Sequence, residues 1–146
     1  MLSWFMDIAV IDTSIFVSAV MKSWTVPRQV LRLCLSGEVQ PLMGNALFTE
    51  YEDVLSRKDL FEGAALEDSE RSQLLDAYLS VCRWVPIYYL WRPNLRDEAD
   101  NHLVELALAG NARWVVTGNK ADLGSGELLF PELRIVTARE FLGARS

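Results

Sequence analysis

Five side chains with oxygen donor atoms border apolar segments at widely separated places in the chain. Asp12 ends one apolar run, Glu50 lies beside the apolar stripe of a predicted helix, and Asp100 precedes another helix. Asn119 and Asp122 follow a further apolar run. Carboxylate and amide oxygens are the ligands that Mg²⁺ and Mn²⁺ prefer in proteins. Such an ion can generate a hydroxide from water, and a pair of ions can stabilise an in-line displacement at phosphorus.

Apolar runs that predict strands alternate with amphipathic segments that predict helices, so we expect a parallel sheet covered on both faces. This is an α/β fold, a three-layer αβα sandwich with a parallel central sheet. The carboxyl ends of its strands meet at one edge, where ligands bind in open sheets of this kind. The five side chains are expected to converge there. We expect strands at 7–12, 39–43, 85–89, 114–117 and 133–136, and helices after Asp12, from Pro27 to Gly37, from a cap at Asn45, over 66–83, through 103–108, and from a capping box at Thr137.

Composition favours one domain over residues 1–146, because 51% of them are hydrophobic and no linker or repeat divides the chain. No basic leader precedes the first strand, and its apolar run is far shorter than the about 20 residues that span a membrane. We therefore expect a soluble, cytoplasmic protein. Cys34 and Cys82 have no nearby cysteine or histidine, which disfavours zinc and favours free thiols, although a disulfide stays open.

A formal net charge of −6 makes a nonspecific nucleic-acid coat protein improbable. It does not exclude a nuclease, because such an enzyme can concentrate carboxylates around divalent cations and hold phosphates with a few basic residues.

Four segments together resemble the successive signatures of the PIN-domain family, and more narrowly the toxin-like, VapC-type ribonucleases of bacterial toxin–antitoxin pairs. They are Ile11 to Ser14, Glu50 to Leu55, Arg96 to Asn101 and Val116 to Lys120. The resemblance implies a ribonuclease that depends on Mg²⁺ or Mn²⁺, with RNA as substrate and an antitoxin protein as partner. It implies metal ligands at Asp12, Glu50 and Asp100. The fourth acid of the family falls on Asn119, and Asp122 is near enough in sequence to substitute.

Each of these acids also has a structural interpretation. Asp12 and Asp100 could cap the helices that they precede. Glu50 is harder to explain structurally, because burying an unpaired carboxylate is unfavourable. Asp97 is a secondary candidate ligand that could equally be a solvated acid or a partner of Arg96.

Ser14 and Thr117 are secondary candidates that could orient a carboxylate or a metal-bound water, although such hydroxyls often cap helices. His102 is the single histidine, expected at the rim, and it offers no nucleophile–base pair. Arg96, Arg113 and Lys120 are the candidates for phosphate contacts, with surface solvation as the alternative.

The aromatic residues Tyr88, Tyr89 and Trp91 could stack bases, but packing on an edge strand or a subunit interface explains them as well, and we favour the interface. Together with the five tryptophans of the chain they favour a homodimer or larger oligomer.

Two other functions compete. A haloacid-dehalogenase-type phosphatase also places an acid after its first strand, but it needs a second acid two residues later, where Ser14 stands. A PIN-like domain that has weakened or lost catalysis and binds RNA or protein stays open, because Asn119 replaces an acid and the surface is acidic.

Overall fold

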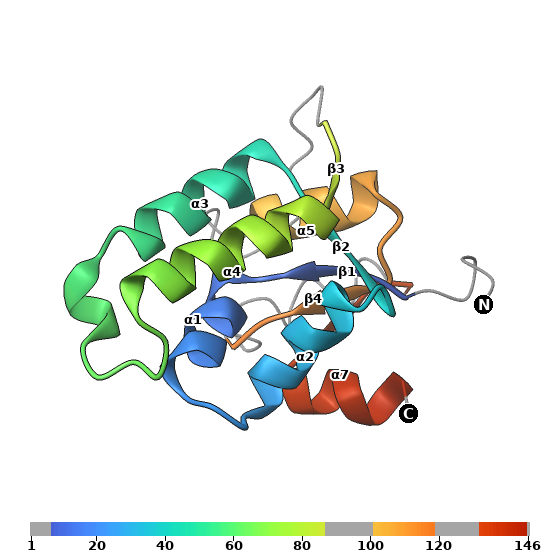
Figure 1. Ribbon diagram of the computed structural model, residues 1–146. Helices are drawn as coiled ribbons and strands as arrows, with labels where there is room; N and C mark the ends of the chain where they lie inside the picture. The colour runs from blue at the N-terminus through green and yellow to red at the C-terminus, as the bar shows by residue number, and fades with distance from the viewer. Residues whose placement is uncertain (1–6, 87–100, 119–131, 146) are drawn as a thin grey trace.

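A parallel five-stranded sheet forms the centre of the computed structural model, which describes residues 7–86, 101–118 and 132–145 (Figure 1). All four strand pairings are parallel, and the order across the sheet is β3-β2-β1-β4-β5. The strands are β1 (Asp7–Ile11), β2 (Val39–Met43), β3 (Arg83–Trp84), β4 (Trp114–Val116) and β5 (Arg134–Val136). The chain runs from β1 outward to β3 on one side of the sheet and then adds β4 and β5 on the other side. The strand order therefore reverses between β1 and β4, and ligand sites form at such a reversal in open parallel sheets.

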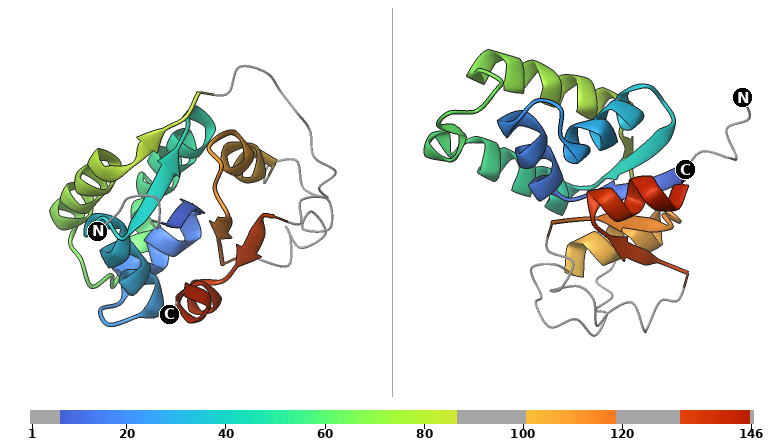
Figure 2. Two further views of the ribbon diagram at one scale, coloured as in Figure 1. Left: turned by 90° about the vertical axis from the view of Figure 1, so that its right-hand side faces the viewer. Right: turned by 90° about the horizontal axis from the view of Figure 1, so that it is seen from below.

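Helices cover both faces of this sheet, so the predicted three-layer αβα sandwich is confirmed. Helices α2 and α7 pack on one face, and α5 packs on the other (Figure 2). The helices are α1 (Thr13–Met21), α2 (Val26–Leu35), α3 (Asn45–Leu55), α4 (Asp68–Val81), α5 (Asn101–Ala109) and α7 (Ala138–Arg145), with a 3₁₀ turn, η2, at Lys58–Phe61. None of the helices within the described ranges is long and apolar enough to span a membrane.

The strand predicted at 85–89 is displaced in the structure. Strand β3 comprises Arg83 and Trp84, and Val85 donates one more backbone hydrogen bond to Met43. Pro86 has no N–H, so it cannot donate to the ladder; the rest of the predicted strand lies outside the described residues. The preceding helix also ends earlier than predicted, because Cys82 has an extended backbone.

The two predicted helix caps differ in outcome. The box at the start of α7 is confirmed, since Thr137 N–H donates to Glu140 Oε1 at 2.9 Å and Glu140 N–H donates to Thr137 Oγ1 at 3.1 Å. The cap at Asn45 is wrong. Gly44 occupies the cap position of α3, and no side chain caps that helix.

An aromatic cluster holds α3 against the end of β1. Tyr51 is fully buried, packs edge-on to Phe16 and stacks on Tyr78 at a centroid distance of 5.9 Å. Its hydroxyl donates a 2.8 Å hydrogen bond to the carbonyl of Ile11. Buried polar groups are normally paired in this way. Glu50 precedes Tyr51, and Asp12 follows Ile11. This hydrogen bond therefore fixes the positions of the two acids relative to each other.

Candidate metal centre

Asp12 lies where the carboxyl ends of three strands meet. Its N–H donates to the carbonyl of Val116 at 2.9 Å, and Thr117 N–H donates to the carbonyl of Val136 at the same distance. Backbone pairing therefore continues one residue past β1 and β4. The Asp12 side chain is only 6% exposed and makes no capping hydrogen bond to α1. The structure thus gives the carboxylate a role other than that of a helix cap.

Hydroxyl groups surround the Asp12 carboxylate. Thr117 Oγ1 donates to Oδ2 at 2.6 Å, and Ser14 Oγ donates to the same oxygen at 3.2 Å. Ser14 Oγ also accepts a hydrogen bond from Gly118 N–H at 2.9 Å. A Cβ at Gly118 would approach Ser14 Oγ to 3.2 Å, so this position favours glycine. These contacts hold the side chain of Asp12 in one orientation.

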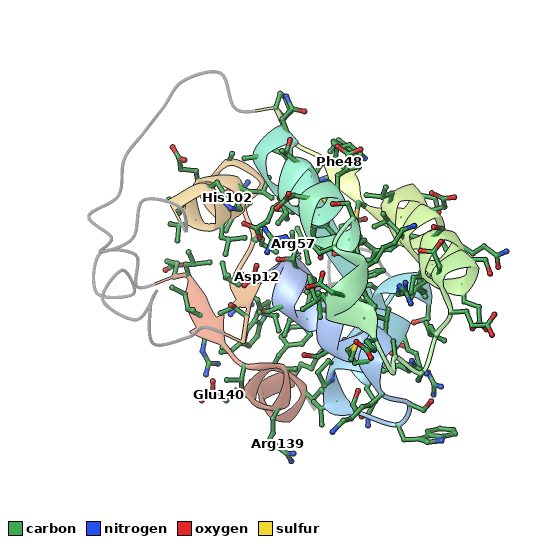
Figure 3. The ribbon with its side chains drawn as sticks, turned by 90° about the vertical axis from the view of Figure 1, so that its left-hand side faces the viewer. Asp12, Phe48, Arg57, His102, Arg139 and Glu140 are labelled. Atoms are coloured by element: carbon green, nitrogen blue, oxygen red, sulfur yellow. The ribbon has the colours of Figure 1, made fainter. Side chains whose placement is uncertain are left out.

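Glu50 reaches the same place from α3. Thr13 Oγ1 lies 2.8 Å from Glu50 Oε1 and 3.3 Å from Asp12 Oδ1, so this hydroxyl stands between the two carboxylates. The other oxygen, Oε2, lies 3.3 Å from His102 Nε2 on α5. Figure 3 labels Asp12 at the end of β1 and His102 at the start of α5. Three elements thus bring polar side chains to one edge of the sheet.

The two carboxylates have unequal proton affinities. Burial raises the pKa of Asp12; the hydrogen bond from Thr117 opposes this, and the nearby charge of Glu50 raises the pKa further. The hydrogen bond to His102 lowers the pKa of Glu50, against the effect of its partial burial. Among the described residues no lysine or arginine forms an ion pair with either acid. Two close carboxylates with one histidine, and no lysine or arginine, beside them form a site that a cation would stabilise.

The donor set fits a hard divalent cation in kind. Carboxylate and hydroxyl oxygens are the ligand type of Mg²⁺ and Mn²⁺. Within the described ranges, however, no group of three or more histidine, cysteine or acidic side chains could hold a metal by itself. The other predicted ligands, Asp100, Asn119 and Asp122, lie outside the described residues. Described residues close to Asp100 and Asn119 in the sequence do lie at the site. His102 contacts Glu50, and Gly118 N–H donates a hydrogen bond to Ser14 Oγ.

The structure corrects one predicted phosphate contact. Arg113 was expected beside the cleft, but its N–H donates to the carbonyl of Ile8, near the amino end of β1. Residues before a parallel strand lie at the edge of the sheet opposite its carboxyl ends, so Arg113 is at the wrong edge to meet a substrate at Asp12. Arg96, Asp97 and Lys120 lie outside the described residues.

Sequence reasoning underestimated two residues of α5. His102 was placed at the rim, but its side chain is only 18% exposed and contacts Glu50. Glu105 was missed; it is 9% exposed, and its Oε2 has no hydrogen-bond partner. The available signal was an acid within an otherwise apolar helical stretch, three residues after the single histidine.

Comparison with known proteins gives three results. A family model described as "PIN domain" matches residues 8–121. Among solved structures, the fold is similar to a chain of VapBC2 from Rickettsia felis, determined bound to a DNA fragment from their promoter. The TM-score is 0.59 and the identity 18%, over 88% of this chain and 96% of that one. No significant match was found among curated proteins.

The structural likeness has too low an identity to show more than a common fold. The family model, by contrast, covers most of the sequence, including Asp12, Glu50 and His102. This chain therefore belongs to the PIN-domain family.

Proposed function

We propose that this protein is a divalent-metal-dependent endoribonuclease and the toxin of a toxin–antitoxin pair. The observation that supports it most directly is the pairing of Asp12 with Glu50 at the carboxyl edge of the sheet, where among the described residues no lysine or arginine pairs with either acid and His102 is the one basic side chain in contact. Two close carboxylates repel each other and destabilise a fold, so such a pair is expected where a cation binds. PIN domains are in general nucleases, which fits this chemistry.

The residues have two kinds of role in the proposal, as metal ligands and as groups that orient a ligand. Asp12, Glu50 and Asp100 would hold Mg²⁺ or Mn²⁺, with Asn119 or Asp122 as a fourth oxygen donor. A bound ion of this kind lowers the pKa of water and stabilises charge at a phosphodiester. Thr117 and Ser14 fix the direction of the Asp12 carboxylate, as hydrogen-bonded neighbours do for metal ligands generally.

Hydrolysis would proceed by direct attack of water. A covalent intermediate needs a nucleophile activated by a base. The chain has one histidine, and that residue contacts Glu50 rather than a serine, threonine or cysteine. No covalent intermediate is therefore expected.

The partner and assembly states are part of the same proposal. The structural similarity to a VapBC2 chain motivates a cognate antitoxin protein as partner. Leu60 is 42% exposed and Leu35 36% exposed, which is consistent with a homodimer or larger assembly. Light scattering of the purified protein tests this, and a monomer mass at all micromolar concentrations would contradict it. The expected location is the cytoplasm.

The test of the enzymatic proposal compares two acids of the same strand. Asp12→Asn should lower the rate of RNA cleavage in Mn²⁺ by at least about 100-fold, because a metal contributes several kcal/mol to charge stabilisation. Asp7→Asn is the matched control, since Asp7 lies at the opposite end of β1 in an ion pair with Arg145. It should leave the rate unchanged. Equal rates for Asp12→Asn and the parent would refute the site.

The competing function is a PIN-like module that binds RNA or protein without cutting it. It predicts that the parent protein binds RNA but releases no product in Mg²⁺ or Mn²⁺. It also predicts that Mn²⁺ does not raise the melting temperature, whereas a ligand that binds only the folded state must raise it.

A further inference from the structure

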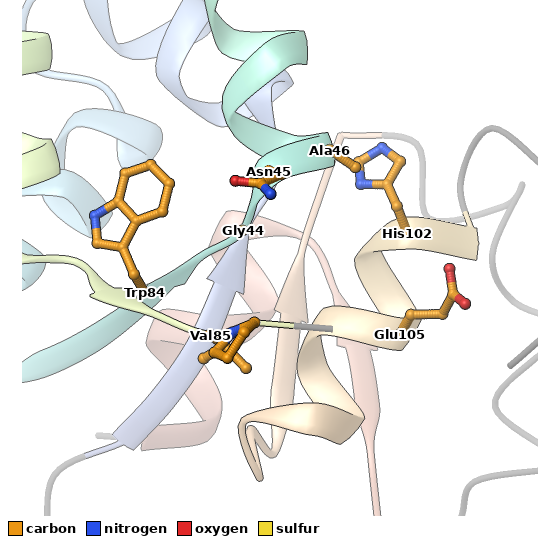
Figure 4. Close-up of a pocket in the computed structure, with 8 residues that line it drawn as sticks. Gly44, Asn45, Ala46, Trp84, Val85, His102 and Glu105 are labelled. Atoms are coloured by element: carbon orange, nitrogen blue, oxygen red, sulfur yellow. The ribbon is translucent and has the colours of Figure 1, made fainter. Parts of the chain in front are cut away.

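A pocket adjoins the carboxylate pair but is not part of it. It has a volume of about 410 Å³ and lies between the start of α3, the end of β3 and the first turns of α5. This volume falls within the range of about 300–1,000 Å³ that is common for small-ligand sites. Figure 4 shows Trp84 on one side, His102 and Glu105 on the other, and Asn45 between them. All of its lining residues are described.

Trp84 offers a flat aromatic surface at this pocket. Its side chain belongs to an edge strand and remains 47% exposed, although burying an indole is normally favourable. Phe48 of α3 packs edge-on against the indole at a centroid distance of 5.4 Å. The ring is therefore supported from one side while part of its surface stays open to a ligand.

The start of α3 supplies polar groups beside this ring. No side chain caps the helix, so the first backbone N–H groups of an 11-residue helix are free of side-chain partners. Such groups attract phosphate. The Asn45 side chain, which adds an amide donor and acceptor, projects between Trp84 and His102 (Figure 4). At Gly44 a Cβ would lie 3.3 Å from Leu106 Cδ1, so the pocket floor is closely packed.

Two unpaired polar atoms lie on the α5 side of the pocket. Glu105 is 9% exposed, and its Oε2 has no hydrogen-bond partner; His102 Nδ1 is likewise buried and unpartnered. A buried polar atom without a partner is unfavourable by about 1–3 kcal/mol, so a side-chain rotation that brings it to a hydrogen-bond partner in the pocket would be favoured. A carboxylate oxygen accepts hydrogen bonds, so it requires an N–H or O–H group. Nucleosides carry such groups on the base and ribose, whereas a phosphodiester carries none.

His102 connects this pocket to the proposed metal centre. Its Nε2 lies 3.3 Å from Glu50 Oε2, while the residue itself lines the pocket. A nucleotide next to a phosphate held at Asp12 and Glu50 would therefore be within reach of the pocket.

We propose that this pocket binds one nucleotide of single-stranded RNA next to the cleavage point. The base stacks on Trp84, the phosphate lies at the start of α3, and Glu105 accepts a hydrogen bond from the nucleoside. This inference rests on the proposed ribonuclease function and adds a subsite to it. Stacking on aromatic side chains is the common way in which proteins hold unpaired bases.

The test measures RNA binding in the cleavage-deficient Asp12→Asn protein. The probes are five-nucleotide RNAs that carry 2-aminopurine at successive positions, because stacking quenches the fluorescence of that base. At one position, binding should quench the signal. Trp84→Ala should abolish this quenching and raise the Kd about 5- to 100-fold, while Trp84→Phe should retain most of both. Trp24→Ala is the matched control, an exposed tryptophan between α1 and α2, and should match the parent.

Glu105→Gln gives a second test with a predicted sign. If Glu105 accepts a hydrogen bond from the nucleoside, the amide should bind RNA several-fold more weakly. If it only repels phosphate, removing its charge should tighten binding, and that result would overturn its assigned role. Melting temperatures of all variants verify that they remain folded.

The outcomes separate this inference from the function on which it rests. If the active parent cleaves RNA but Trp84→Ala neither alters quenching nor raises the KM, the subsite is wrong and the ribonuclease stands. A change in oligomeric mass on Trp84→Ala, with RNA binding unchanged, would assign Trp84 to an interface instead. If the parent neither binds nor cleaves RNA, both proposals fail.

Discussion

The two ends of β1 carry the same residue type in opposite surroundings. At the amino end, Asp7 forms a 2.7 Å ion pair with Arg145 of α7, and both side chains are about one-fifth exposed. At the carboxyl end, Asp12 is more deeply buried, its partners are hydroxyl groups, and its closest charged neighbour is another acid. Asp7 is neutralised within the fold. Asp12 has no lysine or arginine partner among the described residues, which is why we propose that it binds a cation.

This difference separates an acid that is paired within the fold from one that is proposed to bind a cation. Burial alone does not, because a buried acid with a basic partner contributes to stability. The distinguishing feature is a pair of acids fixed by neutral donors at the edge of the sheet where ligands bind.

The largest effect is expected from a second pair of acids, on α3. Glu50→Gln should reduce RNA cleavage by about 100-fold or more, because it removes a charged ligand next to Asp12. Glu52→Gln changes the same residue type on the same helix, two residues away on an exposed side, and should change the rate less than about twofold. Steady-state cleavage rates of the two variants give the measurement. Similar losses in both would show that α3 tolerates no change, rather than that Glu50 binds metal.

A moderate effect is expected on the stability of the metal-free protein, and its sign should differ between Asp12→Asn and Asp7→Asn. Because the pKa of Asp12 is raised by burial, its contribution to stability is fully present below its ordinary pKa and is lost as pH rises through the folded pKa. At neutral pH the ionised carboxylate is therefore unfavourable. Asp12→Asn should stabilise the metal-free protein by about 0.5 to 2 kcal/mol, whereas Asp7→Asn should destabilise it by about 1 kcal/mol through loss of the ion pair.

Urea unfolding in EDTA at several pH values measures this contrast. The advantage of Asp12→Asn over the parent should grow as the pH rises from the ordinary pKa of Asp12 through its raised pKa in the folded protein. An advantage that shrinks over this interval, or a destabilised Asp12→Asn protein at neutral pH, would show that the carboxylate is satisfied without a cation.

The smallest effect concerns residue 119, where the family pattern has an acid. Asn119→Asp would add one negative charge to the proposed site, and two unit charges about 4 Å apart interact by about 1 kcal/mol in water. The metal concentration for half-maximal cleavage should therefore fall about fivefold. A titration of the cleavage rate with Mg²⁺ measures it. An unchanged midpoint would place residue 119 away from the ion and favour Asp122 as the fourth donor.

Sequence reasoning identified the fold because its signals are local. An apolar run followed by Asp12-Thr13-Ser14 predicts a buried strand leading into a helix, and parallel topology follows from the alternation of elements. The rule for the carboxyl edge then predicted where Asp12 and Glu50 should lie, and the structure brings them together. The bond from Tyr51 to Ile11, which fixes their positions, could not be predicted from the pattern.

The errors have physical reasons. Arg113 was assigned to the cleft, but the strand that follows it carries Arg113 and Thr117 to opposite edges of the sheet. Strand β3 was predicted to begin at Val85, whereas pairing with β2 begins at Arg83. His102 and Glu105 were undervalued because the direction of a helix face depends on tertiary packing, which periodicity does not supply.

Calorimetric titration with Mn²⁺ tests the central comparison most directly, because it requires neither RNA nor an antitoxin. The parent protein and Asp7→Asn should bind Mn²⁺ with the same affinity. Asp12→Asn should bind at least about 10-fold more weakly, since it removes a charged ligand from a buried site. Binding of Mn²⁺ by Asp12→Asn as tight as that of the parent would contradict the assignment of the metal centre to the carboxyl end of β1.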